Sequence, residues 1–189
     1  EEGVELAAAT MAGMTFGDPW DASNLMGPLV SAKQRDRVLG YIEKGKAEAR
    51  LVVGGSAPSD RKGYFVQPTL FADVDPKAVI AQEEIFGPVL SIIAYEDEDD
   101  AVRIANDSIY GLSGDVTSAS EERALRVARR IRTGTMSING GVYISPDVPF
   151  GGYRQSGIGR EHGREGFEEY LETKTVAIPA ESGAPKLLG

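Results

Sequence analysis

The sequence predicts an α/β fold in which a mainly parallel sheet is flanked by helices. Segments with strand character alternate with segments of helical periodicity along most of the 189 residues. Residues 31–49 carry an apolar stripe at helical spacing, and residues 89–95 form a short apolar run after a Gly-Pro turn, as in a buried strand. Because such alternation is typical of βαβ units, we expect the strands to lie largely parallel.

The first half of the chain is predicted to contain two helices and two strands. Ala-rich residues 4–14 favour a helix, and the Asp-Pro turn in residues 16–20 ends it. Ser31 is the expected N-cap of the second helix. Its apolar stripe consists of Val38, Leu39 and Ile42. Residues 50–53 have strand character and end at a Gly-Gly pair, and the second strand is the apolar run already described.

The second half begins with the acidic residues 96–100, which are expected to open a helix because carboxylates in a first turn favour the helix dipole. The further elements expected are a strand at 112–117, a helix at 119–132 ending near Gly134, a strand at 135–139, a Gly-rich loop at 149–163, a short helix to about residue 171, a strand near 174–178 and a flexible tail from Ala180.

The composition excludes several classes of function. The chain has 20 Lys and Arg against 29 Asp and Glu, a net charge of −9 that repels a phosphate backbone, so no nucleic-acid partner is expected. No apolar stretch approaches a membrane span and the first residues do not resemble a secretory signal, which leaves a cytoplasmic location as the default. With no Cys and a single His, the chain offers no Cys nucleophile and no multi-His metal site.

Three motifs are better explained by structure than by chemistry. The acidic run at 96–100 lacks the spacing of a calcium loop, and the arginines between 123 and 132 lie opposite an apolar face. The Gly-rich segment 156–166 has the wrong glycine spacing for a dinucleotide loop. Within it, His162 is the one imidazole available for a catalytic triad, and a structural hydrogen-bond donor is the favoured interpretation.

Two other segments leave functional alternatives open. Glu84 sits in EEIFGPV, where a Gly-Pro turn follows the aromatic Phe86. Its carboxylate either grips the hydroxyls of a ligand, with the ring packed on a flat group, or is buried and caps backbone N–H groups. Phe150 precedes two glycines in PFGG, and it is either a core residue, the favoured interpretation, or part of a pocket.

Taken together, a series of motifs resembles one family, the aldehyde dehydrogenases, over about residues 11–178. The motifs are MGPL at 26–29, GYFVQPTLF at 63–71, EEIFGPV at 83–89, YGLSGDV at 110–116, GTMSIN at 134–139 and PFGGYRQSGIGRE at 149–161. They resemble the C-terminal, catalytic and oligomerisation portion of an NAD(P)-dependent enzyme. The resemblance implies the catalytic-domain fold of that family, truncated at its N-terminal side.

The resemblance also implies a reaction and a set of site residues. In the family, a Cys thiolate attacks the aldehyde, hydride passes to NAD or NADP, and a Glu-activated water releases the acid. By position, the cofactor residues are Glu84 at the nicotinamide ribose hydroxyls, Phe86 beside the nicotinamide, and Gln34 and Arg37 on the adenosine side. The aldehyde tunnel residues are Phe150 and Ile144, the latter at a position that is often aromatic in related enzymes. No metal is implied.

Several catalytic residues and one domain of the family are absent from this chain. The family's Cys nucleophile, general-base Glu, oxyanion Asn and dinucleotide-binding domain all lie upstream, so the chain alone is expected to be inactive. The expected partners are an aldehyde, the upstream half of the enzyme and further copies in a homo-oligomer. Residues 1–172 are then a partial catalytic domain, and residues 173–189 an oligomerisation strand with a flexible tail. The alternative is a non-catalytic assembly or binding module, although such a module has no need of Glu84 and Phe86.

Overall fold

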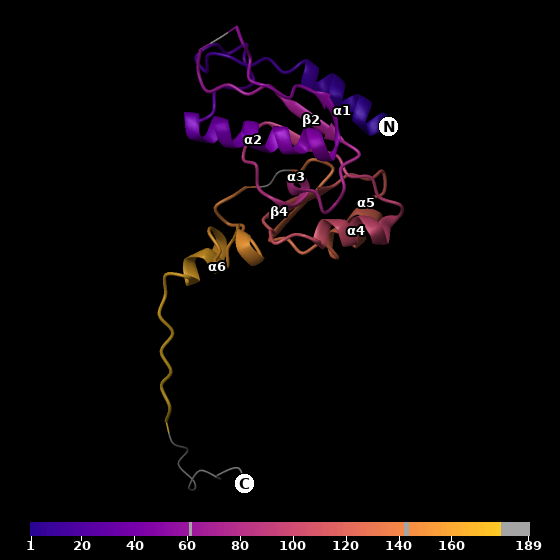
Figure 1. Ribbon diagram of the computed structural model, residues 1–189. Coiled ribbons are helices and arrows are strands. Elements are labelled where there is room, and N and C mark those ends of the chain that lie inside the picture. The colour runs from indigo at the N-terminus through magenta and orange to yellow at the C-terminus, as the bar shows by residue number, and fades with distance from the viewer. Residues whose placement is uncertain (61, 142–143, 179–189) are drawn as a thin grey trace. The chain divides into compact units, whose positions relative to one another are not determined.

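The computed structural model describes residues 1–60, 62–141 and 144–178, and the predicted tail from Ala180 lies outside them. The chain forms two compact units. Figure 1 shows the course of the chain and labels its helices and strands. Unit 1 comprises Glu1–Ile109 with Leu125–Arg132, and unit 2 comprises Tyr110–Ala124 with the residues from Thr133 onward.

Unit 1 is built on a three-stranded sheet in the order β1-β2-β3. Its strands are β1 (Arg50–Val53), β2 (Thr69–Ala72) and β3 (Val89–Ser91). β1 pairs with β2 antiparallel, and β2 pairs with β3 parallel. The predictions of β1 and β3 are confirmed, although β3 is shorter than the apolar run at 89–95. The central strand β2 was not predicted.

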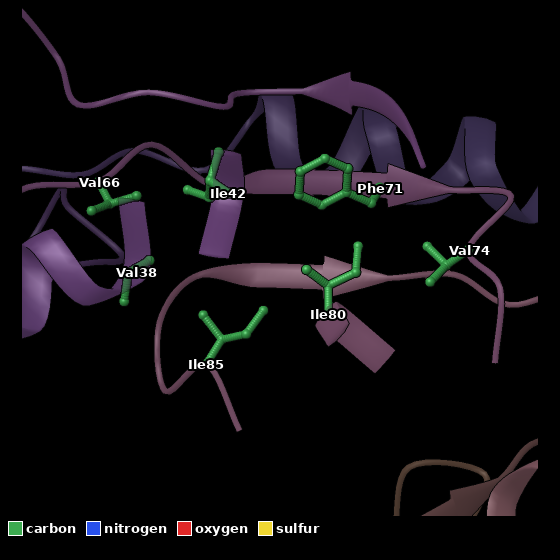
Figure 2. Packing of buried hydrophobic residues seen from close by; sticks show 7 residues of the cluster. All are labelled: Val38, Ile42, Val66, Phe71, Val74, Ile80 and Ile85. Carbon is green, nitrogen blue, oxygen red and sulfur yellow. The ribbon is translucent and has the colours of Figure 1, made fainter. Parts of the chain in front are cut away.

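β2 is buried along its whole length because helices cover both of its faces. Phe71 packs with buried residues of α2 (Ala32–Glu48), whereas Leu70 and Ala72 pack with buried residues of α1 (Glu2–Ala12). Since successive strand side chains point to opposite faces, α1 and α2 lie on opposite sides of the sheet. Figure 2 shows Phe71 within the cluster that includes Val38 and Ile42 of α2.

Both predicted helices of this region are confirmed. The Ser31 hydroxyl accepts a hydrogen bond from the Gln34 backbone N–H at 3.2 Å, as expected of an N-cap in extended conformation. Val38 and Ile42 are fully buried, and Leu39 packs against the same cluster. α2 therefore presents one face to the core and leaves the flanking face for other contacts.

The acidic run opens α4 (Glu98–Asn106), as predicted. Asp97 is the N-cap and accepts from the Asp100 backbone N–H at 2.8 Å. The guanidinium of Arg103 bonds to the Asp100 carboxylate and lowers the pKa of that carboxyl, with a further contribution from the Glu96 N–H. Among the described residues, no cluster of three acidic or imidazole side chains has a geometry that could hold a metal ion. Unit 1 also contains the short helix α3 (Val79–Gln82).

Unit 2 contains a parallel pair, β4 (Ser113–Val116) and β5 (Thr135–Ile138), and both strands were predicted. α5 (Glu121–Ala128) follows β4, and its residues from Leu125 onward are counted with unit 1. It is shorter than the expected helix at 119–132, so Gly134 does not end it. The remaining elements are the single-turn η1 (Arg154–Ser156) and α6 (Gly163–Glu168). Two of the three strand pairings among the described residues are parallel, which confirms the predicted α/β class.

The strand expected near residues 174–178 does not form within the single chain. Residues 172–178 have no regular secondary structure, and Val176 and Ile178 are exposed. A strand is stabilised by hydrogen bonds to a neighbour, and no strand of the described chain pairs with this segment. Within the described residues, no helix combines the length and the apolar composition needed to cross a membrane.

Candidate functional site

The turn between α3 and β3 places two of the predicted cofactor side chains outside and one apolar side chain inside. Ile85 is buried in the core cluster, as Figure 2 shows. Its neighbours Glu84 and Phe86 are exposed, Phe86 to 75%. The alternative in which Glu84 is a buried, capping carboxylate is therefore wrong, because the buried Ile85 directs both flanking side chains outward.

Two side chains of α2 hold the backbone of this turn. The amide nitrogen Nε2 of Gln34 donates to the carbonyls of Ile85, at 3.2 Å, and Phe86, at 2.9 Å. The guanidinium of Arg37 donates to the carbonyl of Glu84. Three successive carbonyls are thus bound by one helix. The four predicted cofactor residues lie together, and the roles that the family resemblance gives them stay predictions.

The backbone at Phe86 has a conformation that bulky residues rarely adopt. Its φ is +56°, in the left-handed region, which is unfavourable by roughly 1–2 kcal/mol for a residue with a Cβ. The Gln34 bonds and the burial of Ile85 maintain it. Next to it, a Cβ on Gly87 would lie 2.6 Å from Cγ2 of Val38, so only glycine permits this approach. Backbone strain that the surroundings enforce in this way is common at ligand sites.

A further link between α2 and the turn was missed by sequence reasoning. The Tyr41 hydroxyl donates to Oε2 of Glu83 at 2.6 Å. The Arg37 guanidinium lies 5.2 Å from the centre of the Tyr41 ring. Gln34, Arg37 and Tyr41 follow each other at steps of three and four residues, which places them on one face of a helix. That spacing was a readable signal, because the face they form flanks the apolar stripe.

The Glu84 carboxylate makes no hydrogen bond or ion pair with any residue in the described ranges. Its two oxygens are acceptors only and can receive bonds from two adjacent hydroxyls, as in a ribose. The exposed Phe86 ring provides a flat apolar surface two residues away. The turn therefore fits a ligand that combines a vicinal diol with a flat ring.

In unit 2, Phe150 and Ile144 lie on one loop. The backbone of Phe150 pairs with Glu161, with N–H to carbonyl distances of 2.8 and 2.7 Å. Phe150 is half-buried and is not among the core residues, so the interpretation as a core residue is wrong; Ile144 is exposed. Ahead of Phe150, the Ser145 hydroxyl bonds to the Asp147 carboxylate and lowers the pKa of that carboxyl.

The Gly-rich loop that follows is closed by its own contacts. Arg160 Nη1 donates to the carbonyls of Gly152, at 2.9 Å, and Gly159, at 2.8 Å. A Cβ on Gly134 would lie 1.7 Å from the carbonyl oxygen of Gly151, so the start of β5 touches the loop backbone directly. The loop backbone at Phe150 is thus held by contacts within unit 2, and Gly151 and Gly152 permit close packing of its backbone, since a Cβ on either would lie 2.4 or 2.6 Å from a neighbouring atom.

Within the described part of the chain, His162 lacks the partners that either of its two considered functions requires. It is exposed, has a φ of +62° and directly precedes α6. Its imidazole has no hydrogen-bond partner in the described part of the chain, so it is not the structural donor that was favoured. The same observation leaves it without the carboxylate and hydroxyl partners that a triad requires.

The family profile described as "Aldehyde dehydrogenase family" matches residues 1–176. Geranial dehydrogenase of Castellaniella defragrans is 52% identical over 180 residues, which are 94% of this chain and 37% of that protein. Betaine aldehyde dehydrogenase of Brucella melitensis biotype 2 is 50% identical over 167 residues, 86% of this chain and 34% of that protein. The chain therefore spans just over a third of the length of these curated relatives.

Solved structures of aldehyde dehydrogenases are also similar to this chain. An aldehyde dehydrogenase of Mycobacterium tuberculosis, complexed with NAD+, matches with a TM-score of 0.90 and 49% identity, covering 97% of this chain and 38% of that one. A mutant of aldehyde dehydrogenase C from Pseudomonas syringae, complexed with NAD+ and octanal, has a TM-score of 0.90 and 44% identity, covering 96% and 38%. Both likenesses extend over nearly the whole of the chain.

Proposed function

The chain belongs to the aldehyde dehydrogenase family, and from that premise we propose that it forms part of an enzyme that oxidises an aldehyde to a carboxylic acid with NAD or NADP. In this proposal the chain contributes part of the nicotinamide-ribose site and part of the aldehyde tunnel. The Cys nucleophile and the dinucleotide-binding domain come from the upstream part of the enzyme. One observation carries the proposal: the turn that α2 holds, which presents Glu84 and Phe86 outward.

Each residue of the turn has a defined task toward the cofactor. The Glu84 carboxylate accepts hydrogen bonds from the two hydroxyls of the nicotinamide ribose and so fixes the position of that sugar. The Phe86 ring packs beside the nicotinamide and keeps water from one side of it. When bound, NAD or NADP accepts the hydride that the aldehyde loses.

Gln34 and Arg37 donate hydrogen bonds to the turn and, in this proposal, also contact the adenosine side of the cofactor. Gln34 uses its amide N–H groups on the turn, which leaves its Oε1 as an acceptor for a hydroxyl. Arg37 uses Nη2 on the turn, which leaves Nε and Nη1 as donors. Both side chains therefore keep polar atoms available on the face of α2 that meets the turn.

Phe150 and Ile144 are proposed to line the aldehyde tunnel from their shared loop. The relatives are named for geranial and for betaine aldehyde, and one neighbouring structure contains octanal. These three aldehydes therefore make the first substrate panel. We further propose a cytoplasmic homo-oligomer, in which the exposed residues near Val176 and Ile178 gain a partner strand from another copy.

A titration followed by NMR tests the cofactor site in this chain alone. Adding NAD+ or nicotinamide mononucleotide should shift the backbone amide signals of Glu84 and Phe86 more than those of distant residues, because both ligands carry the nicotinamide ribose. Nicotinamide alone, which lacks the ribose and its two hydroxyls, should shift the Glu84 signal much less. If neither nicotinamide ligand changed the signals of the turn, the proposal would be contradicted.

A further inference from the structure

The contact between Tyr41 and Glu83 connects α2 to the first residue of the cofactor turn. We propose that this pair positions the turn, so that Tyr41 sets how well Glu84 and Phe86 receive the nicotinamide ribose. Tyr41 itself is a positioning residue that acts through Glu83 and Arg37, without touching the ligand. The inference rests on the proposed function of the turn and adds a residue that controls it.

The pair is placed to fix the start of the turn. The Glu83 backbone N–H donates to the carbonyl of Val79 at 2.9 Å, which attaches this residue to the end of α3. Its carboxylate accepts the Tyr41 hydroxyl at 2.6 Å, which attaches the same residue to α2. Gln34 fixes the other end of the turn through the Phe86 carbonyl. The segment that carries Glu84 is therefore held at both ends by one rigid helix.

The pair also keeps the carboxylates of two adjacent acidic residues apart. Glu83 and Glu84 are consecutive and exposed, and each is an acceptor for any hydroxyl that approaches. The Tyr41 hydroxyl engages the Glu83 carboxylate and holds it on α2, whereas the Glu84 carboxylate has no partner among the described residues. A ribose then meets one carboxylate in one orientation rather than two that compete.

Tyr41 further orients the residue that binds the middle of the turn. Nη2 of Arg37 lies 3.4 Å from the Tyr41 hydroxyl and also donates to the Glu84 carbonyl. The guanidinium lies 5.2 Å from the centre of the Tyr41 ring, within the range of a cation–π contact. The ring and the hydroxyl thus restrict the same guanidinium, and removal of the hydroxyl loosens two attachments of the turn at once.

The test is the substitution Tyr41→Phe in the 189-residue chain, which keeps the ring and removes the hydroxyl. We expect lower ¹⁵N order parameters at Glu84 and Phe86, together with a Kd for nicotinamide mononucleotide that rises about three- to tenfold, the range for loss of one exposed charge-assisted hydrogen bond. In a Glu83→Ala background the same substitution should have a smaller effect on both readouts, because only the contact of the hydroxyl with Arg37 is then left to lose.

The matched control is Lys46→Gln, which removes an exposed ion pair with Glu43 from the same helix. It should leave the order parameters and the Kd unchanged. Unchanged order parameters at Glu84 and Phe86 in Tyr41→Phe would overturn the inference, even if the Kd for nicotinamide mononucleotide changed. Lower order parameters in a chain that does not bind nicotinamide mononucleotide would support the positioning role and contradict the proposed function instead.

Discussion

Replacing Glu84 by Gln is expected to raise the Kd of the chain for nicotinamide mononucleotide about ten- to a hundredfold. The substitution keeps the size of the side chain and removes its charge, which weakens the hydrogen bonds from the two ribose hydroxyls. Hydrogen bonds to a charged group contribute about 1.5–3 kcal/mol, compared with about 1 kcal/mol for a neutral pair. Because Glu84 is exposed and has no partner among the described residues, the fold should be unaffected. The Kd is measured by the NMR titration described above.

The control for this result is Glu5→Gln, which makes the same change at an exposed position of α1. It lowers the net negative charge by the same amount, so it corrects for the general repulsion between an acidic chain and a ligand phosphate. A Kd that is the same in Glu84→Gln and Glu5→Gln would contradict the role of Glu84.

Replacing Phe71 by Ala is expected to lower the free energy of unfolding by about 3–5 kcal/mol, the range for removal of a buried aromatic side chain. Phe71 is fully buried at the centre of the core that Figure 2 shows. Its ring reaches the backbone of α2, since a Cβ on Gly45 would lie 2.7 Å from Cζ of Phe71. The substitution therefore leaves a cavity under the helix that carries Gln34 and Arg37. Urea unfolding followed by circular dichroism measures the change.

Phe86→Ala is the matched control, because it removes the same group from a side chain that is 75% exposed. Its free energy of unfolding should change by less than about 1 kcal/mol, since little buried apolar area is lost. Equal losses in the two variants would show that Phe71 is not the centre of the core.

The elements that were predicted correctly are those whose signals are local. The Ser31 cap, the stripe at Val38 and Ile42, and the acidic start of α4 depend on residues within one or two helical turns. β2 lacked such a signal. Because both of its faces are covered, its four residues show no alternation of apolar and polar side chains, and it is too short for its apolar character to stand out.

The candidate site likewise combines residues that have a local sequence signal with long-range contacts that have none. The Gly-Pro turn and the neighbouring aromatic identified Glu84 and Phe86 locally. Whether Glu84 is buried depends on the direction of Ile85, and the contacts of Gln34 and Arg37 with the turn join residues about fifty positions apart. Such long-range contacts have no pattern in one sequence, so the role of α2 in holding the turn became visible only in the structure.

The most direct test of the proposed function is the formation of NADH or NADPH from geranial, betaine aldehyde and octanal by the purified chain. The assay is run on the chain alone and after addition of the upstream part of a family member. Without a cysteine, the chain alone should form no reduced cofactor, and addition of the upstream part should restore turnover with at least one aldehyde. Turnover by the chain alone would contradict the account, because the oxidation would then proceed without the Cys nucleophile.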